Sequence, residues 1–263
     1  MELKGAALGA MLRVGFPAVD TAPTYKNEAA VGAGLQRDRQ YLICKVPRRA
    51  SGAAARTSTA AEVRAAVAAS LRKLCVQRCD LLLLHWPDRA IEDGTLAEVW
   101  GAMEAAREAG ECGALGVCNF SVAALQTLLP LCTSSPPAVN QVERHPLCQQ
   151  RELLEWCTAQ RIVLQAHTPL GNGKAQLLQH EAVVRVAQAS GLTPAGVLLR
   201  WNLAHGVAVA PKCSSKAHAD DVLEAATGTL APEHMAALDA IETTHRFVNP
   251  PFMGAGANAR YRW

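Results

Sequence analysis

An α/β fold, built on a parallel sheet that is flanked by helices, is what the 263-residue sequence predicts. Short apolar runs rich in Val, Leu and Ile alternate with helix-like segments along the chain, as in strands joined by helical crossovers. The strand-like runs are almost continuously apolar, which is expected when helices cover both faces of a sheet. Because no change in composition and no long linker interrupts this alternation, we expect one domain over residues 1–263, with a C-terminal loop from about residue 245.

The individual elements follow from hydrophobic periodicity and from Gly, Pro and capping residues at their ends. Apolar runs of strand length lie at residues 16–20, 40–46, 79–86, 114–118, 138–142, 162–166 and 207–210. Apolar residues recur at helical spacing in residues 1–14, 27–35, 60–74, 95–109, 122–131, 151–159, 181–189, 193–204, 218–226 and 232–241. The chain therefore alternates between strand and helix throughout, with seven recognisable strands.

Polar side chains stand at the C-terminal end of every predicted strand: Asp20, Lys45, His85, Asn119, Gln141, His167 and Lys212. In a (β/α)8 TIM barrel these ends converge on one face, where enzymes of that fold place their active sites. A doubly wound open sheet is the alternative, but it normally binds a dinucleotide at a Gly-x-Gly-x-x-Gly turn, and no predicted strand is followed by one. We therefore expect a TIM barrel, N-terminally truncated to about seven recognisable parallel strands.

Composition narrows the possible partners. The net charge of +3 is mild and both signs are interspersed, which argues against nucleic acid. No apolar run reaches the length that spans a membrane, so no membrane partner is expected. The nine Cys form no Cys-x-x-Cys pair, which favours reduced thiols and a cytoplasmic location. His85, His167 and Asp20 are too few for a metal-dependent hydrolase, so no metal is expected.

Asp20, Tyr25, Lys45 and His85 are the candidate catalytic residues. A free Tyr has a pKa of about 10 and donates a proton at neutral pH only with help from neighbouring groups. Lys45 and His85 end the next two predicted strands, so both would lie near the Asp20–Tyr25 loop. Taken alone, each residue also fits an ordinary structural role, such as a helix N-cap for Asp20 or a core histidine for His85.

These residues and their neighbours resemble the signatures of the aldo-keto reductases. The similarity runs in the family's order from residue 5 to about residue 250. It includes Asp20-Thr21-Ala22 with Tyr25, His85-Trp86-Pro87, Gly116-Val117-Cys118-Asn119-Phe120, Asn140-Gln141-Val142-Glu143, Pro169-Leu170-Gly171, Leu198-Leu199-Arg200-Trp201 and Pro211-Lys212. The resemblance implies an NADP-dependent alcohol dehydrogenase or carbonyl reductase that acts on small-molecule aldehydes, ketones or sugars, and a monomer.

Catalytic roles are carried over with the resemblance. Tyr25 would be the general acid that protonates the carbonyl oxygen as hydride arrives. Lys45 would stabilise phenolate character in Tyr25, while Asp20 would hold the charge of Lys45 in place. His85 would orient the substrate oxygen by a hydrogen bond, with Trp86 beside it in the substrate site.

Cofactor roles are carried over in the same way. Asn119 and Gln141 would hold the nicotinamide carboxamide, which needs both a donor and an acceptor. Lys212, with Ser214 and Ser215, resembles the segment that grips the adenosine 2′-phosphate, which implies NADP(H) over NAD(H). His167 stands where an aromatic ring usually stacks on the nicotinamide, and His218 where an Arg usually clamps the phosphate. The further cofactor candidates are therefore His167 and His218.

Departures from the family pattern keep a second hypothesis open. Cys118 replaces the usual Ser, and Asp221-Val222 replaces the usual Glu-Asn, so with His167 and His218 we expect weaker NADP(H) binding than is normal for the family. The sequence also opens in the helix that precedes the Asp20 strand, so the first barrel strand is expected to be absent. The alternative is a catalytically weak or inactive binding or regulatory protein that keeps the barrel.

Aromatic residues near the predicted loops leave the substrate pocket undecided. Trp86, Phe120, Phe252, Tyr261 and Trp263 would either line the substrate site as an apolar wall or only cover the end of the barrel.

Overall fold

The computed structural model describes residues 12, 14–48, 59–213, 215–250 and 252. The chain divides into two compact units, Met1–Asn140 with Pro250–Trp263, and Gln141–Asn249. The single domain expected from the sequence stays a prediction.

Seven strands form one sheet in which hydrogen-bonded neighbours follow chain order. They are β1 (Ala18–Asp20), β2 (Tyr41–Val46), β3 (Cys79–Leu84), β4 (Cys112–Cys118), β5 (Val139–Glu143), β6 (Val163–His167) and β7 (Ala208–Ala210). All seven predicted strands are thereby confirmed to within two residues at each end. The residues of β5 belong partly to each unit.

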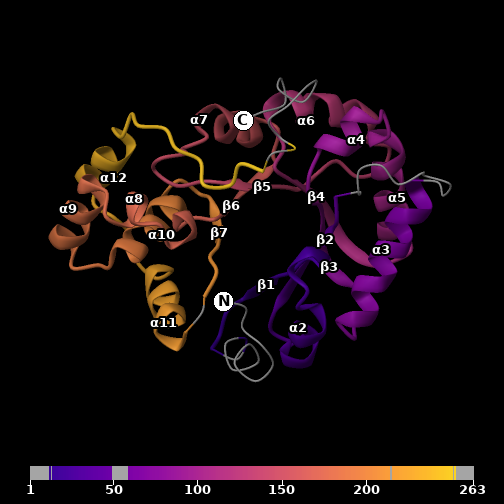
Figure 1. Ribbon diagram of the computed structural model, residues 1–263, viewed down its shortest axis with the longest axis horizontal. Coiled ribbons are helices and arrows are strands. Elements are labelled where there is room, and N and C mark those ends of the chain that lie inside the picture. Colours follow the sequence, from indigo (N-terminus) through magenta and orange to yellow (C-terminus); the bar gives the residue numbers. More distant parts are fainter. Residues whose placement is uncertain (1–11, 13, 49–58, 214, 251, 253–263) are drawn as a thin grey trace. The chain divides into compact units, whose positions relative to one another are not determined.

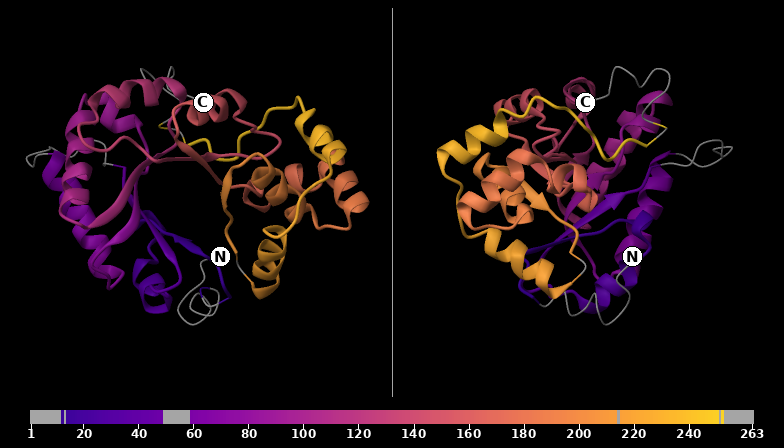
Figure 2. Two further views of the ribbon diagram at one scale, coloured as in Figure 1. Left: turned by 180° about the vertical axis from the view of Figure 1, so that it is seen from behind. Right: turned by 60° about the vertical axis from the view of Figure 1, so that its left-hand side comes forward.

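The first unit packs helices against β1–β4. Its helices are α2 (Glu28–Gly34), α3 (Thr59–Lys73), α4 (Asp88–Glu92), α5 (Leu96–Glu108) and α6 (Val122–Leu128), with 3-10 turns at Pro23–Tyr25 and Leu129–Leu131. α3 lies against β2 and beside α5, which lies against β4 (Figures 1 and 2). Leu81–Leu84 are all buried, as expected for a strand covered on both faces.

Strand periodicity in β2 aims Lys45 at the same face as Ile43. Ile43 packs with Leu81 and Leu83 in a buried cluster, and Lys45 is paired in register with Leu83. Successive side chains of a strand alternate between faces, so Lys45 continues the apolar row of Ile43. The register therefore places an ammonium at the C-terminal end of a buried strand.

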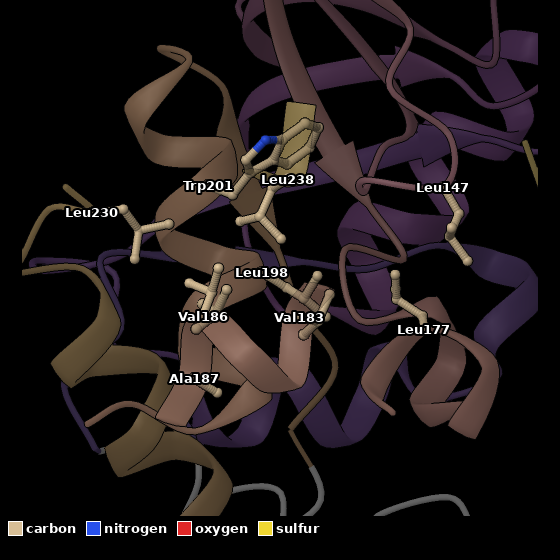
Figure 3. Packing of buried hydrophobic residues seen from close by; sticks show 10 residues of the cluster. Leu147, Leu177, Val183, Val186, Ala187, Leu198, Trp201, Leu230 and Leu238 are labelled. Carbon is tan, nitrogen blue, oxygen red and sulfur yellow. The ribbon is translucent and has the colours of Figure 1, made fainter. Parts of the chain in front are cut away.

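The second unit contains α7 (Arg151–Ala159), α8 (Ala175–Leu178), α9 (Glu181–Ser190), α10 (Pro194–Ala204), α11 (Lys216–Ala225) and α12 (Pro232–Asp239). Figure 3 shows its core, in which Trp201 and Leu198 of α10 pack with Val183 and Val186 of α9 and with Leu238 of α12. Within the described ranges, no single helix has the length and apolar character needed to cross a membrane. In the part of the chain that the structure describes, one pair of helices, α9 and α10 taken together, passes that test, and this pair is bent by 92°.

Most helices begin and end near the predicted positions. Thr193 caps α10 by accepting a hydrogen bond from the N–H of Gly196 at 2.9 Å, as its Thr-Pro start indicates. α11 begins at Lys216 rather than at residue 218, because Ser215 caps it. Of the helix predicted over residues 1–14, only Leu12 is a described helical residue. The 3-10 turn at Pro23–Tyr25, α4 and α8 were not predicted, since three to five residues are too few to show a helical period. The 3-10 turn at Leu129–Leu131 forms the last turn of the helix predicted over residues 122–131.

Candidate active site

A 3-10 turn directly after β1 presents Tyr25. The chain leaves β1 at Asp20, and Pro23 begins the turn that ends at Tyr25. The hydroxyl of Thr21 hydrogen-bonds Asn27 at 3.0 Å across this turn, and Lys26 reverses the chain in the left-handed region, at φ 53°. The cap of the turn is Ala22, so Asp20 is not a helix N-cap. Tyr25 is left 39 % exposed, as a group that meets a substrate must be.

Lys45 is the charged centre of the first unit. Its side chain is 0 % exposed, and its Nζ forms a salt bridge with Asp20 and donates a hydrogen bond to the Tyr25 hydroxyl at 3.4 Å. Burial lowers the pKa of Lys45, but the neighbouring Asp20, Tyr25 and Cys118 together raise that pKa above its usual value. Lys45 is therefore an ammonium at neutral pH, held in place by the Asp20 carboxylate.

The phenol of Tyr25 is protonated at neutral pH. Burial raises its pKa, and this outweighs the lowering effect of Lys45, so the net pKa of Tyr25 lies above its usual value. The pairing of Lys45 with Tyr25 agrees with the sequence-based expectation, and Lys45 does lower the pKa of Tyr25, although the net direction is upward. The proton therefore stays on Tyr25 until a more basic oxygen is presented to it.

His85 directly follows β3 and faces Tyr25. Its backbone N–H donates to the Val46 carbonyl at 3.1 Å, which extends the β2–β3 pairing by one residue. The rings of Tyr25 and His85 meet edge to face with centroids 6.0 Å apart. Burial and the nearby Lys45 charge lower the pKa of His85 to about 4, so the imidazole is neutral. Its buried Nδ1 has no hydrogen-bond partner among the described residues.

Asn119 ties the end of β4 to the same site. It adopts φ 64°, and its Nδ2 donates to the His85 carbonyl at 3.0 Å and to the Cys118 sulfur at 3.2 Å. Burial raises the pKa of the Cys118 thiol to about 12, so this group is an uncharged thiol at neutral pH. The structure thus brings Asp20, Tyr25, Lys45, His85 and Asn119 together within one unit.

Residues proposed to contact the cofactor also occur in the second unit. Gln141 Nε2 donates to the Gln165 side chain at 2.7 Å, and the ring of His167 at the end of β6 contacts the Thr168 hydroxyl at 3.0 Å. Lys212 lies in the segment between β7 and α11, and His218 lies in the first turn of α11; both are exposed. Ser214 lies outside the described residues.

Asp221, which stands in the family's adenine segment, is engaged elsewhere in the second unit. Both of its carboxylate oxygens accept from the Thr193 hydroxyl at 2.9 Å. This contact ties α11 to the start of α10, so Asp221 has a structural partner on an adjacent helix.

The aromatic residues that the sequence placed near the substrate site fall into two groups, those that lie beside His85 and one that is buried in the core. Trp86 is half-buried and stacks on His85, with centroids 6.1 Å apart, and Phe252 meets Trp86 edge-on at 5.2 Å. Phe120 is fully buried and hydrogen-bonds Asn140 through its backbone, so it belongs to the core and not to an exposed wall. Tyr261 and Trp263 lie outside the described residues.

The ion pair between Arg48 and Asp88, at 2.6 Å, was not predicted from the sequence. In the sequence, Arg48 follows the strand predicted over residues 40–46, and Asp88 directly follows the His85-Trp86-Pro87 motif. Both lie two residues beyond a predicted strand end, and the same two strands carry Lys45 and His85 near their ends. That position is the signal by which they could have been found.

Taken together, the site is a protonated phenol beside a buried ammonium and a neutral imidazole, at the C-terminal ends of parallel strands. A model of the Aldo/keto reductase family matches residues 2–243. The chain belongs to the aldo-keto reductase family, a family of oxidoreductases.

Similar proteins cover most of this chain. An aldo-keto reductase of Mycobacterium sp. (strain MCS) is 36 % identical over 250 residues, which are 93 % of this chain and 84 % of that protein. A putative methylglyoxal reductase, DkgA, of Salmonella typhi is 34 % identical over 79 % of this chain and 73 % of its own length. The crystal structure of a mutant of Gox0644 in complex with NADPH is 29 % identical, with a TM-score of 0.82 over 95 % of this chain and 89 % of that chain. The predicted fold class is thereby confirmed.

Proposed function

We propose that this protein reduces aldehydes and ketones to alcohols with NADPH, and that Tyr25 is the general acid. The observation that carries the proposal is the contact of the Tyr25 hydroxyl with the buried, ion-paired Lys45 at 3.4 Å. An isolated surface tyrosine would have no reason to lie against a fully buried ammonium. Strongly perturbed pKa values within one cluster are also typical of catalytic sites.

The chemistry assigned to the chain is proton transfer and charge stabilisation. NADPH, when bound, supplies the hydride that adds to the carbonyl carbon. The oxygen of the substrate then gains negative charge, and Tyr25 gives it the phenolic proton to complete the alcohol. The ammonium of Lys45 stabilises the phenolate that remains, and solvent later restores its proton. Asp20 acts through Lys45 and holds it in place.

His85 is assigned to substrate orientation. Because its pKa is lowered to about 4, it is neutral and carries a single N–H to donate toward the carbonyl oxygen. A charged imidazole in the same place would repel the Lys45 ammonium. This role therefore fits the neutral form that the site enforces.

NADP(H) is the cofactor that we assign, as in the NADPH complex of Gox0644. The amides of Asn119 and Gln141 have the donors and acceptors that a carboxamide needs, and Lys212 is an exposed cation suited to a phosphate. We assign His167 to the nicotinamide ring, and Ser214 and His218 to the neighbourhood of the phosphate.

Steady-state reduction of methylglyoxal and of an aromatic aldehyde tests the proposal. NADPH consumption is followed by its near-ultraviolet absorbance, with wild type compared with Tyr25→Phe. We expect Tyr25→Phe to lower kcat by about 100-fold or more, since positioned acids contribute roughly 10²–10⁴-fold. NADPH binding to Tyr25→Phe, measured by fluorescence titration, should remain.

Equal rates in the two proteins would remove Tyr25 from the mechanism. Retained NADPH binding with no turnover of any carbonyl would favour the alternative, a binding or regulatory protein without catalysis.

A further inference from the structure

Arg48, two residues beyond the end of β2, forms an ion pair with Asp88. Its Nε and Nη2 both lie 2.6 Å from Oδ2 of Asp88, the first residue of α4. The Asp88 side chain is 0 % exposed, so this ion pair is partly withdrawn from water. A charge-assisted contact of this kind holds a guanidinium plane in place as a neutral hydrogen bond would not.

The Asp88 contact lies along one edge of the Arg48 guanidinium. Nε and Nη2 donate in the plane of the group, along one edge, whereas aromatic rings stack on its face. Cζ of Arg48 lies over the ring of Phe252, 4.1 Å from the ring centroid. This distance is well within the range of an attractive cation–π contact.

Phe252 connects Arg48 to the catalytic group. Its ring meets Trp86 edge-on with centroids 5.2 Å apart and an interplanar angle of 88°, and Trp86 stacks on His85 at 24°. Edge-to-face and stacked pairs at such distances are favourable arrangements of aromatic rings. One series of contacts therefore runs from Asp88 through Arg48, Phe252 and Trp86 to His85.

We propose that Arg48 is a positioning residue that seats Phe252 against Trp86, and that these two rings form a specificity wall for carbonyl substrates bearing a flat, aromatic group. The inference rests on the proposed function, because the wall matters only if His85 orients a carbonyl. Phe252 and Trp86 are both half-buried, so each still presents ring surface. An aromatic substrate gains area and ring contacts from such a wall, whereas a three-carbon carbonyl reaches little of it.

Two substitutions and a control separate this role from general packing. Arg48→Lys keeps a cation for Asp88 but removes the planar face, and Phe252→Leu keeps an apolar side chain but removes the ring. Arg39→Lys is the matched control, because the Arg39 side chain is 76 % exposed. Within the described residues, the one ion pair that its side chain forms is with its neighbour Asp38. The substrates are 4-nitrobenzaldehyde and methylglyoxal.

We expect each of Arg48→Lys and Phe252→Leu to raise the KM for 4-nitrobenzaldehyde about fivefold, the equivalent of about 1 kcal/mol for a cation–π contact. The change in kcat should stay within about twofold, and the KM for methylglyoxal should change much less. Because Arg48 acts through Phe252, the double variant should raise KM no further than either single variant.

Single variants whose effects multiply in the double variant would overturn the positioning role, and so would an unchanged KM in Arg48→Lys. A measurement without turnover keeps the inference testable if the proposed function fails. A nuclear Overhauser contact between the rings of Phe252 and Trp86 is expected in wild type and in Arg39→Lys and should be lost in Arg48→Lys. Its persistence in Arg48→Lys would show that Arg48 does not seat Phe252. Lack of turnover in wild type with an intact ring contact would refute only the proposed function.

Discussion

Replacing Asp20 by Asn tests how much the Asp20–Lys45 salt bridge contributes to the stability of the folded protein. Lys45 has a fully buried side chain, and the Asp20 carboxylate, 18 % exposed, forms its salt bridge. Removing one partner of a buried pair typically costs 3–5 kcal/mol, because the remaining charge stays desolvated. The partial exposure of Asp20 and the Tyr25 hydroxyl at 3.4 Å favour the lower end of this range. We expect Asp20→Asn to lose about 3 kcal/mol of unfolding free energy, or roughly 10 °C in Tm.

The pH dependence of this loss has a definite sign. In wild type the folded-state pKa of Lys45 is raised, so its contribution is fully present below the unfolded-state pKa and is lost only as pH rises through the folded-state pKa. In Asp20→Asn the main raising influence is gone, and burial then lowers the pKa of Lys45. Stability of the variant should therefore increase as pH rises toward about 10, the unfolded-state pKa of Lys, while this group contributes no slope in wild type below that pH.

Urea denaturation across that pH range measures the effect. Asp38→Asn is the control, because Asp38 is 76 % exposed and pairs with its neighbour Arg39 at 3.4 Å, so its loss should stay within about 0.5 kcal/mol. Asp20→Asn combined with Lys45→Met removes both charges and should recover much of the stability. An Asp20→Asn protein as stable as Asp38→Asn, with no dependence on pH, would refute the reasoning.

Three further predictions concern single side chains. Since the pKa of His85 is about 4, its titration should not affect kcat/KM above about pH 5. The pH–rate profiles of wild type and His85→Gln measure this. A loss of kcat/KM that begins near pH 6.5 in wild type and is absent in His85→Gln would contradict the prediction. The two carboxylate oxygens of Glu143 accept the N–H groups of Phe247 at 2.7 Å and Val248 at 2.9 Å. Glu143→Gln should leave one of these N–H groups unpaired and lower the free energy of unfolding by about 1–3 kcal/mol. An unchanged midpoint of denaturant unfolding would contradict this prediction. His218→Arg should tighten NADPH binding in calorimetry and not NADH binding, because a guanidinium pairs with a phosphate in two contacts; equal effects on both cofactors would rule this out.

Much of the fold could be read from local sequence. α7 occupies the predicted residues 151–159, and β2 and β5 lie within one residue of their predicted ends, because apolar periodicity and capping residues act over short distances. β3 ends at Leu84 rather than at Trp86, so His85 and Trp86 leave the strand at the point where their side chains meet other rings. Boundaries of this kind depend on tertiary contacts that a local pattern does not contain.

The site was predictable where its residues sit at strand ends, and not where distant segments meet. Tyr25, Lys45 and His85 could be grouped because parallel strands bring their C-terminal ends together. The net upward pKa shift of Tyr25 depends on the degree of its burial, which no spacing in the sequence indicates. The contact of Arg48 with Phe252 joins residues of the first unit that lie 204 positions apart in the sequence, so only the structure shows it.

Isotope transfer most directly tests the claim that the protein reduces carbonyls with NADPH and that Tyr25 is the general acid. Wild-type protein is incubated with a carbonyl substrate and NADPH that carries deuterium on the hydride-donating carbon of the nicotinamide ring. The account predicts an alcohol with deuterium on the former carbonyl carbon, formed by wild type and at least about 100-fold more slowly by Tyr25→Phe. Deuterium transfer at equal rates by wild type and Tyr25→Phe would contradict the account. Tight NADPH binding by wild type with no labelled alcohol from the carbonyl substrate would contradict it as well.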